Sequence, residues 1–254
     1  MTSNSDDWEM HWENLHSATN YEPARKWRRG LIIKSLCLRG NERILDLGAG
    51  KGDLIGDLKG ISSNFEFGAT EFSETGLNMI RSANSELISA KVNLEIGIDS
   101  AQRDLLLSAG NWNIVICSEV LEHLDGTSRA LATIRELSDS DTQIIITVPA
   151  GPMAAVDKAF GHRRHYTKLE LKDLLEFEGF KVQRLECLGF PFFNLYRLGL
   201  LIRGKRILNS IQKMSQSKPG VLSRLLLNIF SWLFRFNWRK GNLGWQFIAV
   251  CRKN

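Results

Sequence analysis

An apolar strand that runs straight into a glycine-rich turn constrains this chain more than any other feature. The run Arg43–Leu47 is followed directly by Gly48-Ala49-Gly50-Lys51-Gly52. Glycines are needed where a turn is tight and where a ligand approaches the backbone with no Cβ in the way. Residue 53 is Asp, where the dinucleotide-binding fingerprint has its third glycine. The sequence therefore predicts a nucleotide-type cradle and argues against a nicotinamide-dependent dehydrogenase.

Short apolar runs alternate with amphipathic segments along most of the chain. The predicted strands are Arg43–Leu47, Phe65–Thr70, Val92–Ile96, Asn113–Cys117, Gln143–Val148, Phe180–Leu185 and Gln246–Cys251. The predicted helices are Pro23–Leu36, Glu74–Ala83, Ala101–Ser108, Ser128–Ser138 and Lys168–Glu178. This alternation predicts βαβ crossovers, and hence an α/β domain whose mostly parallel sheet has helices on both faces. A chain of 254 residues is long enough for one such domain.

An acidic residue stands at the end of the second predicted strand. Glu71 lies 23 residues beyond Gly48, where nucleotide-binding α/β folds place the acceptor for the ribose hydroxyls. The alternative is that Glu71 is only an acid at the start of the next helix. Its distance from the glycine turn favours the ribose role.

Three segments, in order, resemble the motifs of class I S-adenosylmethionine-dependent methyltransferases. They are Ile44–Gly52, Glu71-Phe72-Ser73-Glu74 and Cys117–Leu124. The resemblance covers residues 40–187 and the final strand. It implies a Rossmann-like, seven-stranded, mostly parallel sheet with helices on both faces and an antiparallel last strand. It also implies S-adenosylmethionine as the cofactor.

The resemblance assigns cofactor-binding roles position by position. The residues carried over are Asp46, Gly48, Ala49, Gly50, Glu71, Phe72, Asp99, Ser118 and Glu119. Gly48 and Gly50 would face the methionine part, Glu71 the ribose and Asp99 the adenine. The family usually has an acid just after a glycine, whereas Gly97-Ile98-Asp99 inserts one residue.

A cluster of acids and a histidine follows the fourth predicted strand. We expect Glu119, Glu122 and His123 to begin a helix, because spacings of three and four place side chains on one face. The segment is similar to the metal-binding motif of ubiquinone-pathway O-methyltransferases and of small-RNA 3′-terminal 2′-O-methyltransferases. That similarity implies a site for Mg²⁺, Mn²⁺ or Zn²⁺ made of Glu119, Glu122, His123 and His165. The alternative is a metal-free site whose acids are favoured by the helix dipole.

Histidines offer a second route to catalysis. Without a metal, His123, His162 or His165 would serve as the general base, since imidazole titrates near neutral pH. His162 and His165 belong to the loop after the fifth strand, together with Arg163 and Arg164. In the family this loop faces the acceptor substrate, so its charges imply an acceptor with negative charge. A solvated basic loop is the alternative.

Charge divides the chain into an acidic body and a basic end. Residues 187–254 contain 12 Lys and Arg, no Asp or Glu, and 11 of the 23 aromatic residues. Within Pro219–Phe236 the polar residues Arg224, Asn228, Ser231 and Arg235 form one stripe. A wide apolar face beside an arginine stripe is typical of a helix that lies in a membrane interface. The alternatives are packing on the sheet, contact with a second subunit in a homo-oligomer, and nucleic acid, whose bases can stack on aromatic side chains.

These features predict three parts. Residues 1–38 form an N-terminal helical lid segment, with a helix on the outside of the sheet as the alternative. Residues 39–188 and 245–254 form the S-adenosylmethionine-binding domain, and residues 189–244 form a basic, aromatic, amphipathic helical insertion before the last strand. The four cysteines are widely spaced and include no CxxC pair, so they indicate reduced thiols in a cytoplasmic protein. The first ten residues are polar and acidic, so no signal peptide is predicted.

The sequence therefore predicts an O-methyltransferase for a small-molecule, lipid-like or lipid-linked acceptor. It would be cytoplasmic and peripheral on the inner face of the membrane. One alternative is an RNA ribose 2′-O-methyltransferase. Another is a non-catalytic protein that binds S-adenosylmethionine.

Overall fold

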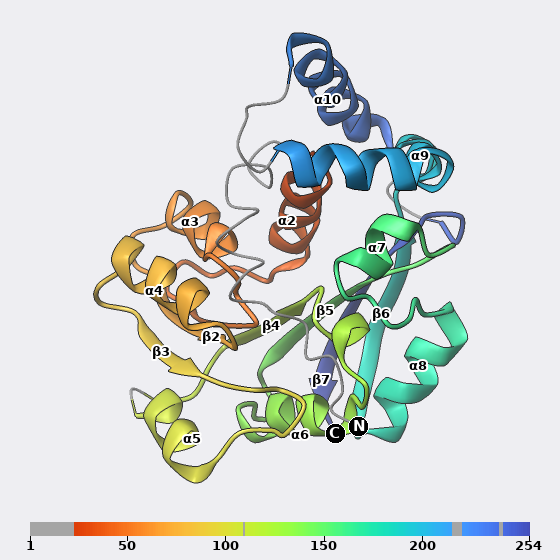
Figure 1. Ribbon diagram of the computed structural model, residues 1–254. Helices are drawn as coiled ribbons and strands as arrows, with labels where there is room; N and C mark the ends of the chain where they lie inside the picture. Colours follow the sequence, from red (N-terminus) through yellow and green to blue (C-terminus); the bar gives the residue numbers. More distant parts are fainter. Residues whose placement is uncertain (1–22, 109, 215–219, 239–240) are drawn as a thin grey trace, which may run out of the picture.

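Seven strands form one sheet in the computed structural model, which describes residues 23–108, 110–214, 220–238 and 241–254 (Figure 1). The strands are β1 Arg43–Leu47, β2 Glu66–Glu71, β3 Ile88–Lys91, β4 Ile114–Ser118, β5 Gln143–Pro149, β6 Phe180–Leu188 and β7 Gln246–Lys253. Their order in the sheet is β3-β2-β1-β4-β5-β7-β6. Strands β1 to β5 pair in parallel, and β7 is antiparallel to both β5 and β6. The predicted fold class, including the antiparallel last strand, is confirmed.

Helices cover the sheet on both sides and at one edge. The helices are α2 Pro23–Ser35, α3 Asp53–Lys59, α4 Glu74–Ala83, α5 Ser100–Leu107, η1 Leu121–His123, α6 Ser128–Glu136, α7 Ala155–Ala159, α8 Lys168–Phe177, α9 Phe192–Met214, α10 Val221–Leu233 and η2 Phe234–Phe236. The predicted helices that became α2, α4, α5, α6 and α8 are confirmed with shifts of two residues or fewer at their ends.

Two core layers follow from the alternation of side chains along the central strands. Ile44 and Ile116 pack with α2, α3 and α4 on one face, while Leu45 and Val115 pack with α5, α6 and α8 on the other. Because neighbouring strand residues point to opposite faces, a sheet buried on both sides needs continuous apolar runs. This requirement explains why six of the seven strands could be located from apolar runs in the sequence.

The third strand was predicted in the wrong place. The structure forms β3 at Ile88–Lys91, ahead of the predicted Val92–Ile96. Val92 and Leu94 are buried, which produced the strand-like pattern. The chain instead turns at Asn93, whose carbonyl oxygen accepts two backbone N–H groups. Apolar side chains that point inward from a turn can thus imitate a strand.

The glycine turn lies tightly against the segment that follows β4. Gly48, Gly50 and Gly52 all have positive φ, at 70°, 60° and 81°. A Cβ on Gly48 would lie 2.6 Å from the Val120 side chain. Only glycine satisfies both the backbone conformation and the close approach.

The segments outside the sheet domain lie together at one end of the molecule. Helices α9 and α10 lie at the top of Figure 1, near α2 and α7. Residues 1–22 of the predicted N-terminal lid segment lie outside the described residues. Across the described ranges, the structure holds no helix with the length and hydropathy needed to cross a bilayer. The four cysteines are free thiols, and three of them, Cys117, Cys187 and Cys251, are buried.

Candidate active site

A cavity of about 360 Å³ lies at the carboxyl ends of the central parallel strands. Ligands in open α/β sheets bind at this edge, where the loops after the strands meet. The ends of β1, β2, β4 and β5 all contribute, and α2, α7 and α9 complete the wall. The cavity therefore joins the predicted cofactor site to the N-terminal helix and the insertion.

Eight of the nine predicted cofactor-binding residues line this cavity. They are Asp46, Gly48, Ala49, Gly50, Glu71, Phe72, Ser118 and Glu119. Glu71 holds the glycine turn in place, because its Oε2 accepts a hydrogen bond of 2.7 Å from the Gly50 backbone N–H. Its Oε1 accepts one of 3.2 Å from the Ser73 N–H. The structure thus brings these residues together, while their binding roles stay predictions.

Asp99 is the ninth, and the structure does not bring it to the cavity. Its carboxylate caps helix α5 instead, accepting a 2.7 Å hydrogen bond from the Gln102 backbone N–H. Asn93, Leu94 and Glu95 line the cavity. The structure therefore does not place Asp99 at the cavity, and the misplaced third strand explains why it was expected there.

Asp46 and Glu71 place two carboxyl groups at one end of the cavity. Burial, followed by the neighbouring Glu71 charge, raises the pKa of Asp46 to about 7. A cationic ligand at this end would offset that repulsion and favour the ionised carboxylate.

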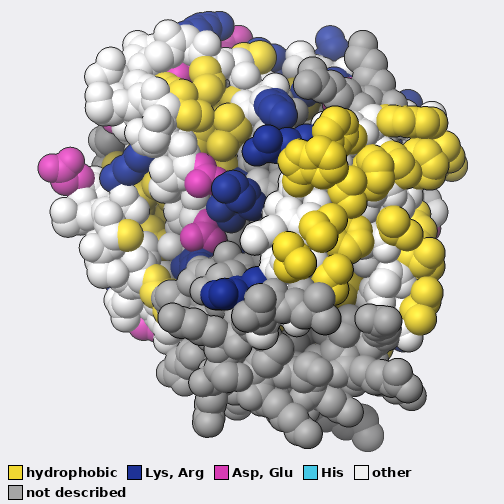
Figure 2. All heavy atoms as spheres, turned by 90° about the horizontal axis from the view of Figure 1, so that it is seen from above, with side chains coloured by type: hydrophobic (Ala, Val, Ile, Leu, Met, Phe, Trp, Pro, Cys, Tyr) yellow, Lys and Arg dark blue, Asp and Glu magenta, His cyan; other side chains and the backbone are white. Residues whose placement is uncertain are grey.

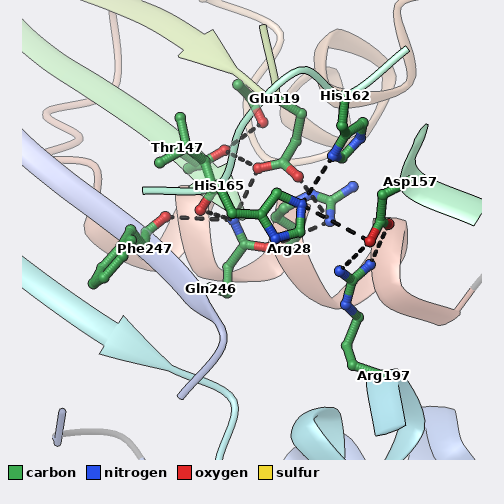
Figure 3. Close-up of polar contacts among 11 residues, drawn as sticks. Arg28, Glu119, Thr147, Asp157, His162, His165, Arg197, Gln246 and Phe247 are labelled. Carbon is green, nitrogen blue, oxygen red and sulfur yellow. Dashed lines mark hydrogen bonds and ion pairs between the residues drawn. The ribbon is translucent and has the colours of Figure 1, made fainter. Parts of the chain in front are cut away.

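Glu119 does not begin a helix, which corrects a second prediction. It has a φ of 57° in the left-handed region, and only a short turn, η1, follows it. Its Oε1 accepts hydrogen bonds from Gln246 Nε2 at 2.8 Å and Thr147 Oγ1 at 3.0 Å. Its Oε2 lies 3.2 Å from Arg28 Nη1 (Figure 3). Glu119 thus links α2, β5 and β7 through its side-chain contacts.

Three histidines lie in a row beside the cavity. The rings of His123 and His162 are 4.7 Å apart between centroids, and His162 Nδ1 lies 3.2 Å from His165 Nε2. His165 Nδ1 lies 3.0 Å from the Gly151 carbonyl oxygen. His123 and His162 line the cavity, whereas His165 does not. The structure therefore places His165 in contact with His162, and its catalytic role stays a prediction.

The hydrogen bonds of this row fix the tautomers. A carbonyl oxygen only accepts, so His165 Nδ1 must donate to Gly151 and its Nε2 must accept from His162 Nδ1. Burial lowers the pKa of both rings, and for His162, with His123 and His165 as neighbours, to about 2. Both are therefore neutral, and His162 Nε2 carries an unprotonated lone pair.

The predicted metal set is not brought together, but a related set is. Ligand atoms of Glu122, His123 and His162 lie within 4.8 Å of one another, and so do those of Asp157, His162 and His165. Neither carboxyl oxygen of Glu122 has a hydrogen-bond partner within the described ranges, although the side chain is fully buried. Burial and the nearby Glu119 raise its pKa well above the ordinary value. A buried carboxyl without a hydrogen-bond partner, lying beside two imidazoles, has the donor chemistry of a divalent cation site.

A buried ion pair ties the insertion to this cluster. Arg197 of α9 donates to both oxygens of Asp157 at 2.7 Å, and Asp157 Oδ2 lies 3.8 Å from His165 Nε2 (Figure 3). Sequence analysis missed Asp157 and Arg197, as well as Arg28 and Gln246. The partner of each of these residues lies on a distant element of the fold. The sequence alone therefore could not show which residues pair.

The two arginines of the loop after β5, Arg163 and Arg164, already have partners. Arg163 forms ion pairs with Asp125 and Glu95, and Arg164 donates to the Asp125 carbonyl oxygen at 2.7 Å. The hydrogen bond from Arg163 lowers the pKa of Asp125. These contacts leave less charge for an anionic acceptor than the sequence indicated.

Comparisons with known proteins agree with this geometry. A family model described as a methyltransferase domain matches residues 21–185. No sequence among the curated proteins matches the chain.

Several solved structures share the fold at low sequence identity. A TehB-like SAM-dependent methyltransferase from Corynebacterium glutamicum is 15% identical, with a TM-score of 0.55 and 99% of each chain covered. A SAM-dependent methyltransferase from Thiobacillus denitrificans, solved with S-adenosyl-L-homocysteine, is 11% identical, with a TM-score of 0.57, covering 96% of this chain and 98% of that one. A structure named StiE O-MT is 10% identical, with a TM-score of 0.55, covering 91% of this chain and 74% of that one.

Proposed function

This chain belongs to the class I S-adenosylmethionine-dependent methyltransferase superfamily, and we propose that it methylates a hydroxyl oxygen of a small, lipid-like acceptor. S-adenosylmethionine is the methyl donor. One observation carries the proposal: the same cavity runs from the glycine turn to His123 and His162. A donor bound at one end and a hydroxyl held at the other would meet within it, and such positioning supplies a large part of the acceleration in group transfer.

The donor end suits a cation. S-adenosylmethionine carries a sulfonium charge, and the carboxyl groups of Asp46 and Glu71 would stabilise it. The glycines of the turn carry no side chain, so the methionine part could approach the backbone closely there. Glu71 would hold the ribose hydroxyls while keeping its hydrogen bond to Gly50.

Apolar side chains form part of the cavity wall on the side of α7 and α9. These side chains are Val156, Phe160, Phe193, Leu200 and Trp245. Apolar and aromatic walls with a few polar groups are typical of sites for small organic molecules. Phosphate-rich RNA would need unpaired cations, whereas Arg28 and Arg197 here are held by Glu119 and Asp157. This lining favours a lipid-like acceptor over RNA.

The histidine row would orient and deprotonate the acceptor hydroxyl. His162 presents an unprotonated Nε2, but with a pKa of about 2 it is a weak proton acceptor at neutral pH. We therefore assign it the binding of the hydroxyl or of a cation, and His123 the role of base in a metal-free site. Glu122, His123 and His162 would hold a divalent cation of the Mg²⁺, Mn²⁺ or Zn²⁺ class, which when bound would lower the pKa of the hydroxyl.

The proposal includes a cytoplasmic location on the inner face of a membrane. Four free cysteines agree with a reducing compartment. The membrane part depends on a separate surface, which is treated below.

Transfer of tritiated methyl groups to separated lipid, small-molecule, RNA and protein extracts tests the acceptor class. The proposal expects label in the lipid or small-molecule fraction. Label in RNA alone would support the ribose methyltransferase instead, and donor binding without transfer to any fraction would support a non-catalytic protein. Treatment with EDTA decides the metal: loss of transfer, restored by Mn²⁺ or Zn²⁺, supports the Glu122 cluster, whereas no change assigns His123 as the base.

A further inference from the structure

Apolar side chains remain exposed along one side of the two insertion helices. We call this side the α9–α10 face. It consists of Leu195, Leu198 and Ile202 on α9 and of Leu225, Leu226, Ile229, Trp232, Phe236 and Trp238 on and after α10. Figure 2 shows hydrophobic side chains gathered on one side of the molecule as seen from above. An apolar patch of this kind on a folded protein usually marks a binding surface.

Helical spacing places exposed apolar residues of α10 and of the short turn η2 on one side. Leu225, Ile229, Trp232 and Phe236 follow at intervals of four, three and four, and between 43% and 55% of each residue is exposed. The opposite side of α10 packs on the protein, because Phe230 contacts Tyr196 of α9. The exposed side therefore does not serve to hold the helix on the protein.

A polar stripe runs beside these apolar residues. Arg224, Asn228, Ser231 and Arg235, each one residue before a member of the apolar stripe, are all exposed. A helix with an apolar side next to a basic side is suited to lie in the headgroup region of a bilayer. Trp and Phe are favoured at that depth.

The charge around the α9–α10 face indicates the kind of surface that it would bind. No Asp or Glu occurs in residues 187–254, and Arg224 and Arg235 are exposed beside the apolar residues. Basic residues near a bilayer are attracted to anionic lipid, and the attraction falls with added salt. We propose that the α9–α10 face docks on an anionic lipid bilayer and that the acceptor enters the cavity from this bilayer. This inference rests on the proposed function, because it supplies the source of the lipid-like acceptor.

Helix α9 separates the cavity from the docking face by one helix diameter, about 10 Å. Its residues Phe193, Arg197 and Leu200 line the cavity, whereas Leu195 and Leu198 are exposed. The buried pair between Arg197 and Asp157 fixes the inner side of the helix. An acceptor leaving the bilayer beside α9 would therefore reach the histidine row without crossing the sheet domain.

Flotation of the full chain with vesicles tests the docking. We compare vesicles of phosphatidylcholine alone with vesicles that also contain phosphatidylglycerol. The protein should float with the anionic vesicles, and less so as salt rises. Ile229→Asp and Trp232→Asp should each weaken partitioning by about tenfold or more, because each removes a large apolar contact with the lipid.

A matched control uses an exposed leucine elsewhere. Leu169 on α8 is 68% exposed and lies off the face, so Leu169→Asp should float like the wild type. Calorimetric titration with S-adenosylmethionine shows whether each variant is folded. The titration also separates the docking proposal from the proposed function. If the protein floats normally but fails to bind the donor or to transfer the methyl group, only the proposed function is contradicted.

Three results would overturn the docking proposal. The first is a wild-type chain that stays unbound with both kinds of vesicle. The second is a gel shift with RNA that Ile229→Asp abolishes, which would assign the face to nucleic acid. The third is a dimer in sedimentation that the same substitution dissociates, which would assign it to a second copy of the chain.

Discussion

Arg28 of α2 pairs with Glu119 beyond β4, with Nη1 and Oε2 3.2 Å apart. The partners come from the N-terminal helix and from the loop that follows a central strand, and both line the cavity. Arg28 Nη1 also lies 3.4 Å from Gln246 Oε1 of β7. Helix α2 is therefore held at the cavity by side-chain contacts of Arg28, in addition to its packing on the sheet.

Loss of the ion pair between Arg28 and Glu119 should weaken donor binding. In Arg28→Ala, the side chain of Glu119 loses its cation, so we expect S-adenosylmethionine affinity to fall about tenfold, the size of one charged hydrogen bond. Isothermal titration measures the effect. Lys26→Ala is the control, because Lys26 is exposed on the same helix. Equal affinities for Arg28→Ala and the wild type would show that α2 does not help to hold the donor.

Donor affinity should depend on pH through Asp46. Its pKa of about 7 means that the carboxyl is partly protonated at neutral pH, and a cationic donor prefers the ionised form. Affinity should rise by about threefold to tenfold from pH 6 to pH 8 and become flat in Asp46→Asn. Because the folded pKa is raised, the stabilising contribution of Asp46 to the ligand-free protein is complete below about pH 4 and is lost as pH rises through 7. A pH-independent affinity in the wild type would contradict this assignment.

The glycine turn should not tolerate a side chain at Gly48. In Gly48→Ala, a left-handed φ of 70° and a contact of 2.6 Å to Val120 both oppose the new Cβ. We expect donor binding to be lost and the melting temperature to fall. Gly56→Ala provides the control, because a Cβ there meets nothing within 4 Å and lies within helix α3. Combining Gly48→Ala with Val120→Ala should restore room but leave the backbone strain, and full recovery of binding would show that the contact alone mattered.

The features that could be predicted from the sequence are those determined by residues adjacent in the chain. The β1 strand and its glycine turn are specified by adjacent residues, and both were predicted correctly. Asp99 was expected at the cavity because Val92 and Leu94 are buried from a turn, which a sequence pattern does not distinguish from a strand.

Contacts between distant elements could not be predicted. Glu119 was expected to share a helix face with Glu122, but its left-handed backbone and its contacts with Arg28 and Gln246 direct it elsewhere. Nothing in the sequence around Arg197 indicated a buried ion pair, because its partner Asp157 lies on another element. The sequence specified the residue types of the site, and only the fold specified their partners.

The buried pair of Asp157 and Arg197 should be important for stability. Arg197→Ala leaves the Asp157 carboxylate without its cation in a site where only 4% of its side chain is exposed. The free energy of unfolding should fall by about 3–5 kcal/mol, as for other broken buried pairs. Denaturation in urea measures it. As a control, Lys172→Ala breaks an exposed pair with Glu176 on α8 and should change stability by less than about 0.5 kcal/mol. A loss as small as that of the control would mean that Asp157 is solvated.

Methyl transfer to a total lipid extract, measured with variants at each end of the cavity, tests the central claim most directly. Labelled donor and wild-type protein should yield alkali-stable label in the lipid fraction, as expected of an O-methyl ether. Glu71→Ala should raise the KM for S-adenosylmethionine. Phe160→Ala should raise the KM for the lipid acceptor and leave donor binding unchanged. Label confined to RNA or protein, or a Phe160→Ala variant with an unchanged KM for the acceptor, would contradict a single cavity that joins donor and lipid-like acceptor.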